Sequence, residues 1–160
     1  MLQNFKKMKP VLLFLPVLLF SCSSGFDEEK ERQAILELHE AQRGYHFQKK
    51  AEEFAGLMSE NYISVNRGQV SRPSYEENVA RFGNYFDSVE FVKWDDVQPP
   101  EVRFSDDGSM AYTVVEKQVV VTYPDERGGT IADTTDFAWI AVYKKYAKGW
   151  KIDCVASTDR

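Results

Sequence analysis

The segment MAYTVVEKQVVVTYP, residues 110–124, constrains the fold most, because it is long, β-branched and aromatic and therefore favours an extended strand. Further strand-like segments precede it, VEFVKWDDV and EVRFS, and two more follow it, TDFAWIAVYKKY and GWKIDCVAS, as a predicted hairpin. SDDGS at residues 105–109 is typical of a tight turn, and the Pro-Pro pair before EVRFS suits a bend or an edge strand. The second half of the chain is therefore predicted to form an antiparallel sheet.

The first half of the chain carries helical patterns instead. Between residues 27 and 48, apolar positions recur at steps of three and four, and the acidic DEEKE suits a helix N-terminus. A short second helix is predicted over residues 51–58, and Ser74 with Glu77 forms a capping box that predicts a third helix. Helices followed by an antiparallel run indicate an α+β domain.

The first 21 residues have the layout of a secretory signal peptide. Three lysines precede the apolar run VLLFLPVLLF, which is too short to cross a bilayer core of about 30 Å as a helix. The letters LFSC, ending at Cys22, resemble the lipobox of bacterial lipoproteins, which implies that Cys22 is lipidated and becomes the mature N-terminus. The alternative is an ordinary export signal with an incidental cysteine.

The lipobox resemblance implies a localisation and a domain organisation. Residues 1–21 are the signal peptide, residues 22–27 a tether and residues 28–158 the folded domain. We expect the protein in the bacterial cell envelope, lipid-anchored in the periplasm or on the outer-membrane surface. Two or three acyl chains anchor a protein stably, whereas one is marginal.

The net charge and the number of cysteines limit which binding partners and disulfides are expected. The formal net charge moves from −5 to −8 when the leader and its three lysines are removed. An acidic globule binds nucleic acid and anionic membranes poorly, so we expect membrane contact through the lipid anchor only. Once Cys22 is lipidated, Cys154 has no partner for an intramolecular disulfide. The sequence has no Gly-rich phosphate loop, serine-nucleophile elbow or zinc-protease motif, and we predict no cofactor and no metal.

Several pieces of the chain resemble the nuclear transport factor 2-like superfamily, closest to its SnoaL-like and domain-of-unknown-function branches. They are LHEAQ, LMSENYISVN, SDDGSMAY and the final GWKIDCVAST, and the resemblance covers roughly residues 28–158. It implies a cone-shaped, cystatin-like roll, in which a strongly bent, mostly antiparallel sheet packs around a long N-terminal helix with two shorter helices. Members include isomerases, dehydratases, epoxide hydrolases and polyketide cyclases, as well as binding and dimerising domains. Function must therefore be argued from the site.

The ketosteroid isomerase branch of that superfamily offers a specific test of catalysis, because it uses a carboxylate base, a tyrosine and a second, protonated carboxylic acid. Laid over this sequence, the base falls at or beside Asn66, the tyrosine near Gln42, and the second acid within residues 137–143, which contain no acid. An amide cannot accept a proton at neutral pH. All three positions depart from the pattern, which argues against that mechanism.

Other proton carriers remain as candidates. His39, Gln42 and His46 form a polar strip on one side of the first helix, and either histidine is a candidate acid or base unless it is simply hydrogen-bonded in the core or partly exposed. Glu116 and Lys117 point to opposite faces of one strand, so Glu116 is either a pocket acid or a solvated outer residue. Two histidines seven residues apart do not match zinc spacing.

The predicted pocket lining combines this strip with nearby polar and aromatic residues: Ile35, His39, Gln42, His46, Asn66, Tyr112 and Trp139. Among the large aromatics Trp94, Tyr112, Trp139, Tyr143 and Trp150, we expect most in the core and one or two in the wall of a pocket. Cys154 is interpreted as a small buried hydrophobe rather than a nucleophile. Beside the turn that follows Asn66, Arg67 and Arg72 are either solvated or face an anionic ligand at the rim.

Three functions are consistent with the sequence. We favour a lipid-anchored envelope protein that binds a small, partly apolar molecule without assigned catalysis. The second is an enzyme of the isomerase, dehydratase or cyclase type that uses His46, His39 or Glu116 as proton carriers. The third is an interaction module whose sheet face pairs with another envelope protein or with a second copy as a homodimer.

Overall fold

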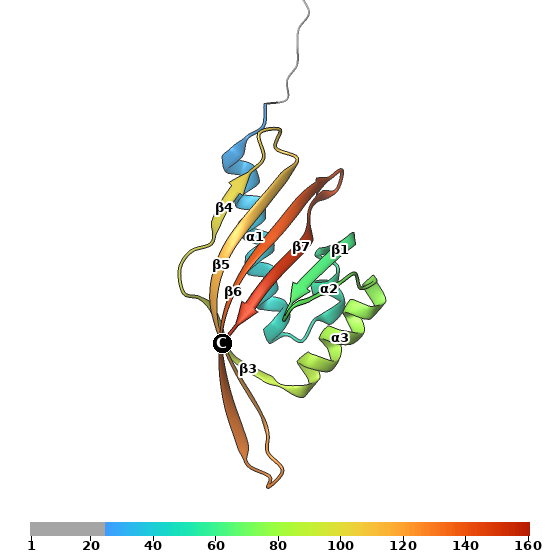
Figure 1. Cartoon of the computed structure of the whole chain (residues 1–160). Helices are drawn as coiled ribbons and strands as arrows, with labels where there is room; N and C mark the ends of the chain where they lie inside the picture. Colours follow the sequence, from blue (N-terminus) through green and yellow to red (C-terminus); the bar gives the residue numbers. More distant parts are fainter. Residues whose placement is uncertain (1–24) are drawn as a thin grey trace, which may run out of the picture.

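The computed structural model describes residues 25–160, so the predicted signal peptide and the lipidation site Cys22 lie outside the described residues. Within this range the elements are α1 (Glu28–Phe47), α2 (Ala51–Ala55), β1 (Met58–Asn66), β2 (Gln69–Ser71), α3 (Tyr75–Ser88), β3 (Glu90–Asp96), β4 (Glu101–Phe104), β5 (Met110–Pro124), β6 (Thr130–Tyr146) and β7 (Gly149–Asp159) (Figure 1). None of the described helices is long and apolar enough to cross a membrane. The predicted α+β class is confirmed.

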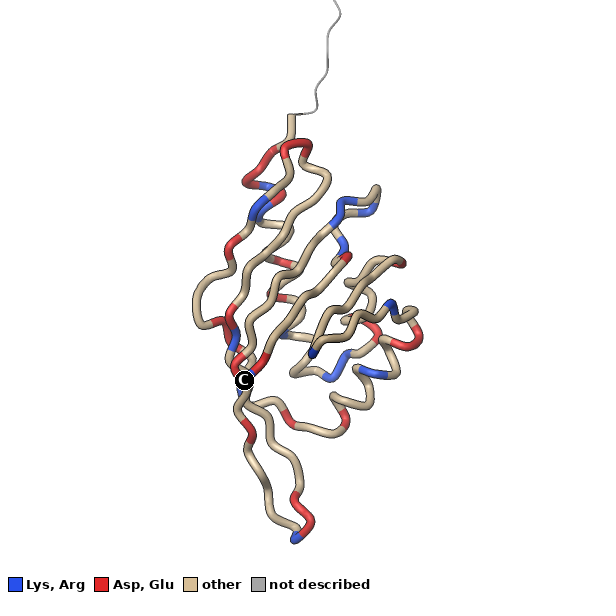
Figure 2. The backbone as a smooth tube through the Cα atoms, viewed as in Figure 1, with Lys and Arg blue, Asp and Glu red and all other residues tan. Residues whose placement is uncertain are grey.

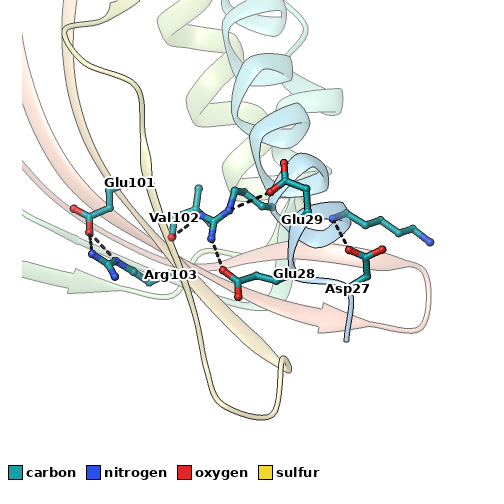
Figure 3. A network of polar contacts seen from close by, with 8 residues as sticks. Asp27, Glu28, Glu29, Glu101, Val102 and Arg103 are labelled. Carbon is teal, nitrogen blue, oxygen red and sulfur yellow. Dashed lines mark hydrogen bonds and ion pairs between the residues drawn. The ribbon is translucent and has the colours of Figure 1, made fainter. Parts of the chain in front are cut away.

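The long helix α1 begins where the acidic pattern predicts. Asp27 caps it by accepting a hydrogen bond from the backbone N–H of Lys30 at 3.2 Å. This end is tied to the sheet, because Arg32 pairs with Glu28 and its Nη1 donates to the carbonyl oxygen of Val102 on β4 at 2.9 Å. Figure 3 labels Glu28 and Val102, the two partners in these contacts. The N-terminal turn of α1 is therefore fixed to an outlying strand before the helix enters the core.

The two shorter helices differ in how well local signals define them. The capping box of α3 is present, because the Ser74 hydroxyl accepts from the N–H of Glu77 and the Glu77 carboxylate accepts from the N–H of Ser74. The prediction that α2 extends to Met58 is wrong: the helix ends at Ala55, because Met58 already pairs with Ile152 of β7. Tertiary pairing shortens this helix.

The strands form one curled sheet in the order β2-β1-β7-β6-β5-β3, with β4 paired to β5. The β1–β7 pair is parallel and all other pairs are antiparallel, which confirms the predicted mostly antiparallel sheet. In Figure 1 the sheet curls around α1, and the β5–β6 hairpin extends beyond the other strands. Figure 2 shows acidic residues gathered at the start of α1 and at the β4–β5 turn, whereas long stretches of the central strands carry no charge.

Alternation along β5 separates the core from the outer face of the sheet. Val115 and Lys117 are buried, whereas Tyr112, Val114 and Glu116 are exposed. The core side contains the fully buried Tyr143, Phe86, Ile35 and Ile152, which join α1, α3, β6 and β7. The concave face of the sheet is thus the side on which helices and strands enclose a site.

Candidate functional site

A cavity of about 220 Å³ lies between the concave face of the sheet and the three helices. Its lining is mostly apolar and aromatic, and the polar side chains in it are partly buried and partly exposed. The lining residues are Gln42, His46, Phe54, Met58, Tyr62, Ser64, Asn66, Arg81, Phe82, Tyr85, Trp94, Val119, Phe137, Trp139, Ala141, Ile152, Val155 and Ser157. We call the exposed end, formed by Asn66, Arg81 and Tyr85, the mouth.

His46 lies at the buried end of the cavity inside a cluster of aromatic rings. Its imidazole stacks on Trp94 with ring centroids 4.5 Å apart and planes 29° apart. Phe54, Phe86 and Phe91 contact it with centroids at 4.7, 4.9 and 5.2 Å. Such offset and edge contacts fix the orientation of a ring more tightly than burial alone.

The protonation of His46 follows from this environment. Its Nδ1 lies 2.6 Å from the carbonyl oxygen of Gln42 and donates the hydrogen bond, which leaves Nε2 as an acceptor. Burial lowers the pKa of His46 to about 4, the Gln42 carbonyl opposes this shift, and the charge of Lys117 reinforces it. His46 is therefore neutral at pH 7.

A second polar group lies behind the wall formed by Trp94. The Lys117 side chain is 1% exposed, and its Nζ lies 2.6 Å from Oδ1 of Asp96. Nε2 of His39 donates to Oδ2 of the same carboxylate at 2.9 Å. Burial acts to raise the pKa of Asp96, but hydrogen bonds from His39 and Lys117 hold it below its usual value, while burial lowers the pKa of Lys117. Neither His39, Asp96 nor Lys117 lines the cavity.

The mouth lies beside the turn between β1 and β2. Asn66 ends β1, and Arg67 and Gly68 follow with φ of 49° and 75°, the left-handed values of a type I′ hairpin turn. Arg67 pairs with Asp159 through Nη2 and Oδ2 at 2.7 Å, so its guanidinium is already matched by a carboxylate. Arg72 is exposed and does not line the cavity.

Four of the predicted lining residues, Gln42, His46, Asn66 and Trp139, do lie on the cavity. Ile35 does not, because it is fully buried in the core cluster. His39 does not line it either, and its ring is hydrogen-bonded to Asp96 instead.

Two expectations about β5 fail for one reason. Tyr112, expected in the pocket, is 43% exposed on the opposite face of the sheet. Glu116, the candidate pocket acid, lies on that same outer face, since the register of β5 turns Lys117 inward. Glu116 therefore cannot carry protons in the cavity.

For several other side chains, the environment in the structure can be compared with the one expected from the sequence. Of the large aromatics, Trp94 and Trp139 line the cavity, whereas Tyr143 and Trp150 are core residues. Cys154 is half-buried rather than buried, and burial raises the pKa of its thiol. Arg81 was missed, although it directly precedes Phe82 on the predicted apolar face of the third helix.

The positions that the ketosteroid isomerase pattern marks all reach the cavity. Asn66 and Gln42 line it, as do Phe137, Trp139 and Ala141 from the segment where the second acid would lie. No aspartate or glutamate is among the lining residues in the described part of the chain. Within residues 25–160, no three His, Cys, Asp or Glu side chains are grouped to hold a metal ion. The lining contributed by the described residues thus lacks the carboxylates that this pattern requires.

Comparison with known proteins shows which solved structures have a similar fold. No protein-family model matches the chain, and no curated protein matches it significantly by sequence. Solved structures do match. A nuclear transport factor 2-like protein from Cytophaga hutchinsonii is 14% identical with a TM-score of 0.61, over 81% of this chain and 98% of that one. A ketosteroid isomerase-like protein from Erwinia carotovora atroseptica is also 14% identical, with a TM-score of 0.59, over 84% and 98% of the two chains.

A third similar structure has a cystatin-like fold. It is a nuclear transport factor 2-like protein with a cystatin-like fold from Novosphingobium aromaticivorans, 14% identical, with a TM-score of 0.57, over 81% of each chain. The curled sheet, the long helix and the cavity between them therefore define a cystatin-like α+β roll. The chain shares this fold with these nuclear transport factor 2-like and ketosteroid isomerase-like structures.

Proposed function

We propose that this domain binds a small, partly apolar molecule in the cavity and does not use the cavity for proton-transfer catalysis. The observation that carries the proposal is a cavity walled by the buried rings of His46, Phe54 and Trp94, with the exposed Asn66, Arg81 and Tyr85 at its mouth. Apolar walls with a few convergent polar groups are typical of small-molecule sites. A volume of about 220 Å³ lies below the roughly 300–1,000 Å³ of pockets for drug-sized ligands, so the ligand is smaller than these.

Binding is a better account of the cavity than catalysis because of its titratable groups. A general base works best when its pKa lies near the operating pH. His46 has a pKa of about 4, and residues 25–160 contribute no carboxylate to the lining that could replace it. His46 Nε2 therefore serves as a hydrogen-bond acceptor for a bound molecule rather than as an efficient base at neutral pH.

The proposal is tested by intrinsic fluorescence, because Trp94 and Trp139 line the cavity and report directly on its contents. A panel of small aromatic and alicyclic compounds should change the emission in a saturable way, and thermal shift assays should rank the same compounds. Ala141→Leu places a larger side chain in the cavity and should abolish both responses. Ala156→Leu makes the same chemical change at an exposed position of β7 outside the cavity and should leave them intact. Equal responses from both variants, or no response to any compound, would rule the proposal out.

We also propose that the mature protein is held in the cell envelope by lipid on Cys22, which the LFSC letters support. Fractionation with metabolic acyl labelling tests this. Cys22→Ala should release the protein from membranes or block its processing, whereas Cys154→Ala should leave it anchored. Unchanged acyl labelling of Cys22→Ala would contradict the anchor.

A further inference from the structure

The cavity carries one cationic side chain at its mouth, Arg81 on α3. The other polar lining side chains, such as Gln42, Ser64 and Ser157, are neutral. His46 adds no second charge at pH 7, because its pKa is about 4. Among the described residues, the lining therefore presents a single positive charge and no negative charge, although the chain as a whole is acidic.

Arg81 differs from most other arginines of this chain in having no carboxylate partner among the described residues. Five arginines form ion pairs with Asp or Glu, namely Arg32, Arg43, Arg67, Arg103 and Arg160. Arg81 instead donates from Nη2 to the amide oxygen of Asn78 at 3.0 Å. An arginine left without an acid in an acidic protein has its charge free for a ligand.

The guanidinium of Arg81 is also held in place. Asn78, its hydrogen-bond partner, is 2% exposed and thus rigidly buried in α3. The Arg81 Cζ lies 4.5 Å from the ring centroid of Phe82, which is in cation–π range. Positioning of this kind reduces the entropy lost when the guanidinium binds, and its planar fork matches a carboxylate in two parallel hydrogen bonds.

Neutral donors accompany the cation at this part of the cavity. The hydroxyl of Tyr62 lies beside Ser64 and Arg81; burial raises the pKa of Tyr62 and the two neighbours oppose the shift. The phenol therefore keeps its proton at neutral pH and can donate it in a hydrogen bond. Tyr62 thus offers a neutral hydrogen-bond donor in the same cavity as the Arg81 cation.

The aromatic walls of the cavity favour an apolar, aromatic part of the ligand. Trp94 and Trp139 have ring centroids 6.1 Å apart, and His46 stacks on Trp94. Flat aromatic walls favour a flat aromatic ligand, since offset and edge contacts between rings add to simple burial. The small volume leaves room for a single ring system with a short substituent.

Resting on the proposed binding function, we infer that the ligand is a small aromatic monocarboxylate, whose carboxylate binds Arg81 at the mouth and whose ring packs against Trp94 and Trp139. A single guanidinium matches one carboxylate and leaves a second one uncompensated. Dicarboxylates and phosphate esters are therefore expected to bind less well.

Pairs of acids and amides with the same shape show how much of the affinity depends on the ligand's negative charge. Benzoate, phenylacetate and 3-phenylpropionate are titrated by calorimetry at pH 7.5 beside benzamide, phenylacetamide and 3-phenylpropionamide. Hydrogen bonds to charged groups imply that the best acid binds about 10- to 100-fold more tightly than its amide. Phthalate serves as the dicarboxylate probe and should bind more weakly than benzoate.

Variants of Arg81 test whether this residue causes the preference for acids over amides. Arg81→Met should reduce acid affinity to that of the amide, and Arg81→Lys should restore part of it, because a lysine keeps the charge without the planar fork. Arg127→Met, which removes the same charge in the β5–β6 loop, should change neither. Circular dichroism checks the fold of each variant, and Arg81 is exposed enough for replacement to be tolerated.

Each outcome decides a different claim. Equal binding of acids and amides to the wild-type protein would overturn the carboxylate inference and leave the binding function standing. An acid preference that persists in Arg81→Met would overturn the role of Arg81. If neither acids, amides nor the uncharged compounds of the fluorescence panel bind, the proposed function fails together with the inference.

Discussion

The ammonium Nζ of Lys117 lies 3.6 Å from the ring centroid of Trp94, a residue that lines the cavity. A buried cation therefore lies against the indole that forms part of the cavity wall. Cation–π contacts reach about 2 kcal/mol when the cation is desolvated, and Asp96 fixes this one at 2.6 Å. The wall on which His46 stacks is thus held from the core side by an ion pair.

The first prediction concerns that ion pair. Asp96→Ala leaves Lys117 buried and uncompensated and should lower the free energy of unfolding by about 3 kcal/mol, the low end for a broken buried pair because the Asp96 side chain is 23% exposed. Lys117→Met removes the cation itself and should cost less. Urea denaturation measures both. Asp95→Ala, which breaks the exposed pair with Arg43, is the matched control and should cost about 0–1 kcal/mol. A larger loss in Asp95→Ala than in Asp96→Ala would contradict this picture.

The second prediction is a pH dependence caused by His46. Its pKa is about 4 in the folded protein and 6.5 in the reference state, so between these values the unfolded chain binds the extra proton. Stability is therefore fully present above about pH 6.5 and is lost as pH falls toward 4, by about 2–3 kcal/mol between pH 7 and 4.5. Denaturant titrations at these pH values measure it.

A variant isolates this effect from other titrations. His46→Phe keeps an aromatic ring in the cluster but cannot take up a proton, so its stability should change less across the same pH range. Asp96 acts at lower pH, because its depressed pKa makes its contribution disappear only below about pH 4. An unchanged pH dependence in His46→Phe would assign the loss to other groups.

The third prediction compares two glycines. Gly68 has φ of +75° in the turn beside Asn66, where a side chain is strained, so Gly68→Ala should cost about 1–2 kcal/mol. Gly44 lies inside α1, and an added Cβ would meet only Gln48 at 3.9 Å, so Gly44→Ala should stabilise by about 0.5–1 kcal/mol. Thermal unfolding of the two variants should shift in opposite directions. Shifts of the same sign would show that the turn or the helix is not as described.

The fourth prediction concerns the start of α3, the helix that carries Arg81. Ser74→Ala removes the side chain that accepts from the N–H of Glu77 and should cost about 1 kcal/mol. Ser71→Ala, at an exposed site in β2, should change stability by less than about 0.5 kcal/mol. Hydrogen exchange should show faster opening of the first turn of α3 only in Ser74→Ala. Uniform exchange in both variants would argue against the capping box.

Much of the fold was predictable because its signals are local. The capping box at Ser74, the acidic start of α1 and the final hairpin each involve residues a few positions apart, and all are present. The resemblance to a known superfamily supplied the curled sheet and the expected positions of a pocket. Asn66 and Gln42 lie on the cavity as that resemblance implied.

The chemistry of the site was less predictable. The sequence shows that Glu116 and Lys117 face opposite ways, but only the pairing of β5 with β6 decides which one enters the core. The pKa of His46 depends on rings contributed by α2, α3 and β3, which no local pattern brings together.

The sequence by itself determined the helix starts, the strand alternation, the acidic charge and the absence of an acid at the positions of a known mechanism, because these properties depend on neighbouring residues or on composition. The tertiary structure decided that Lys117 is buried behind Trp94 and that Arg81 stands at the mouth without a carboxylate partner among the described residues. Both facts depend on contacts between elements distant in the chain, where burial and pairing set the charge that a ligand meets.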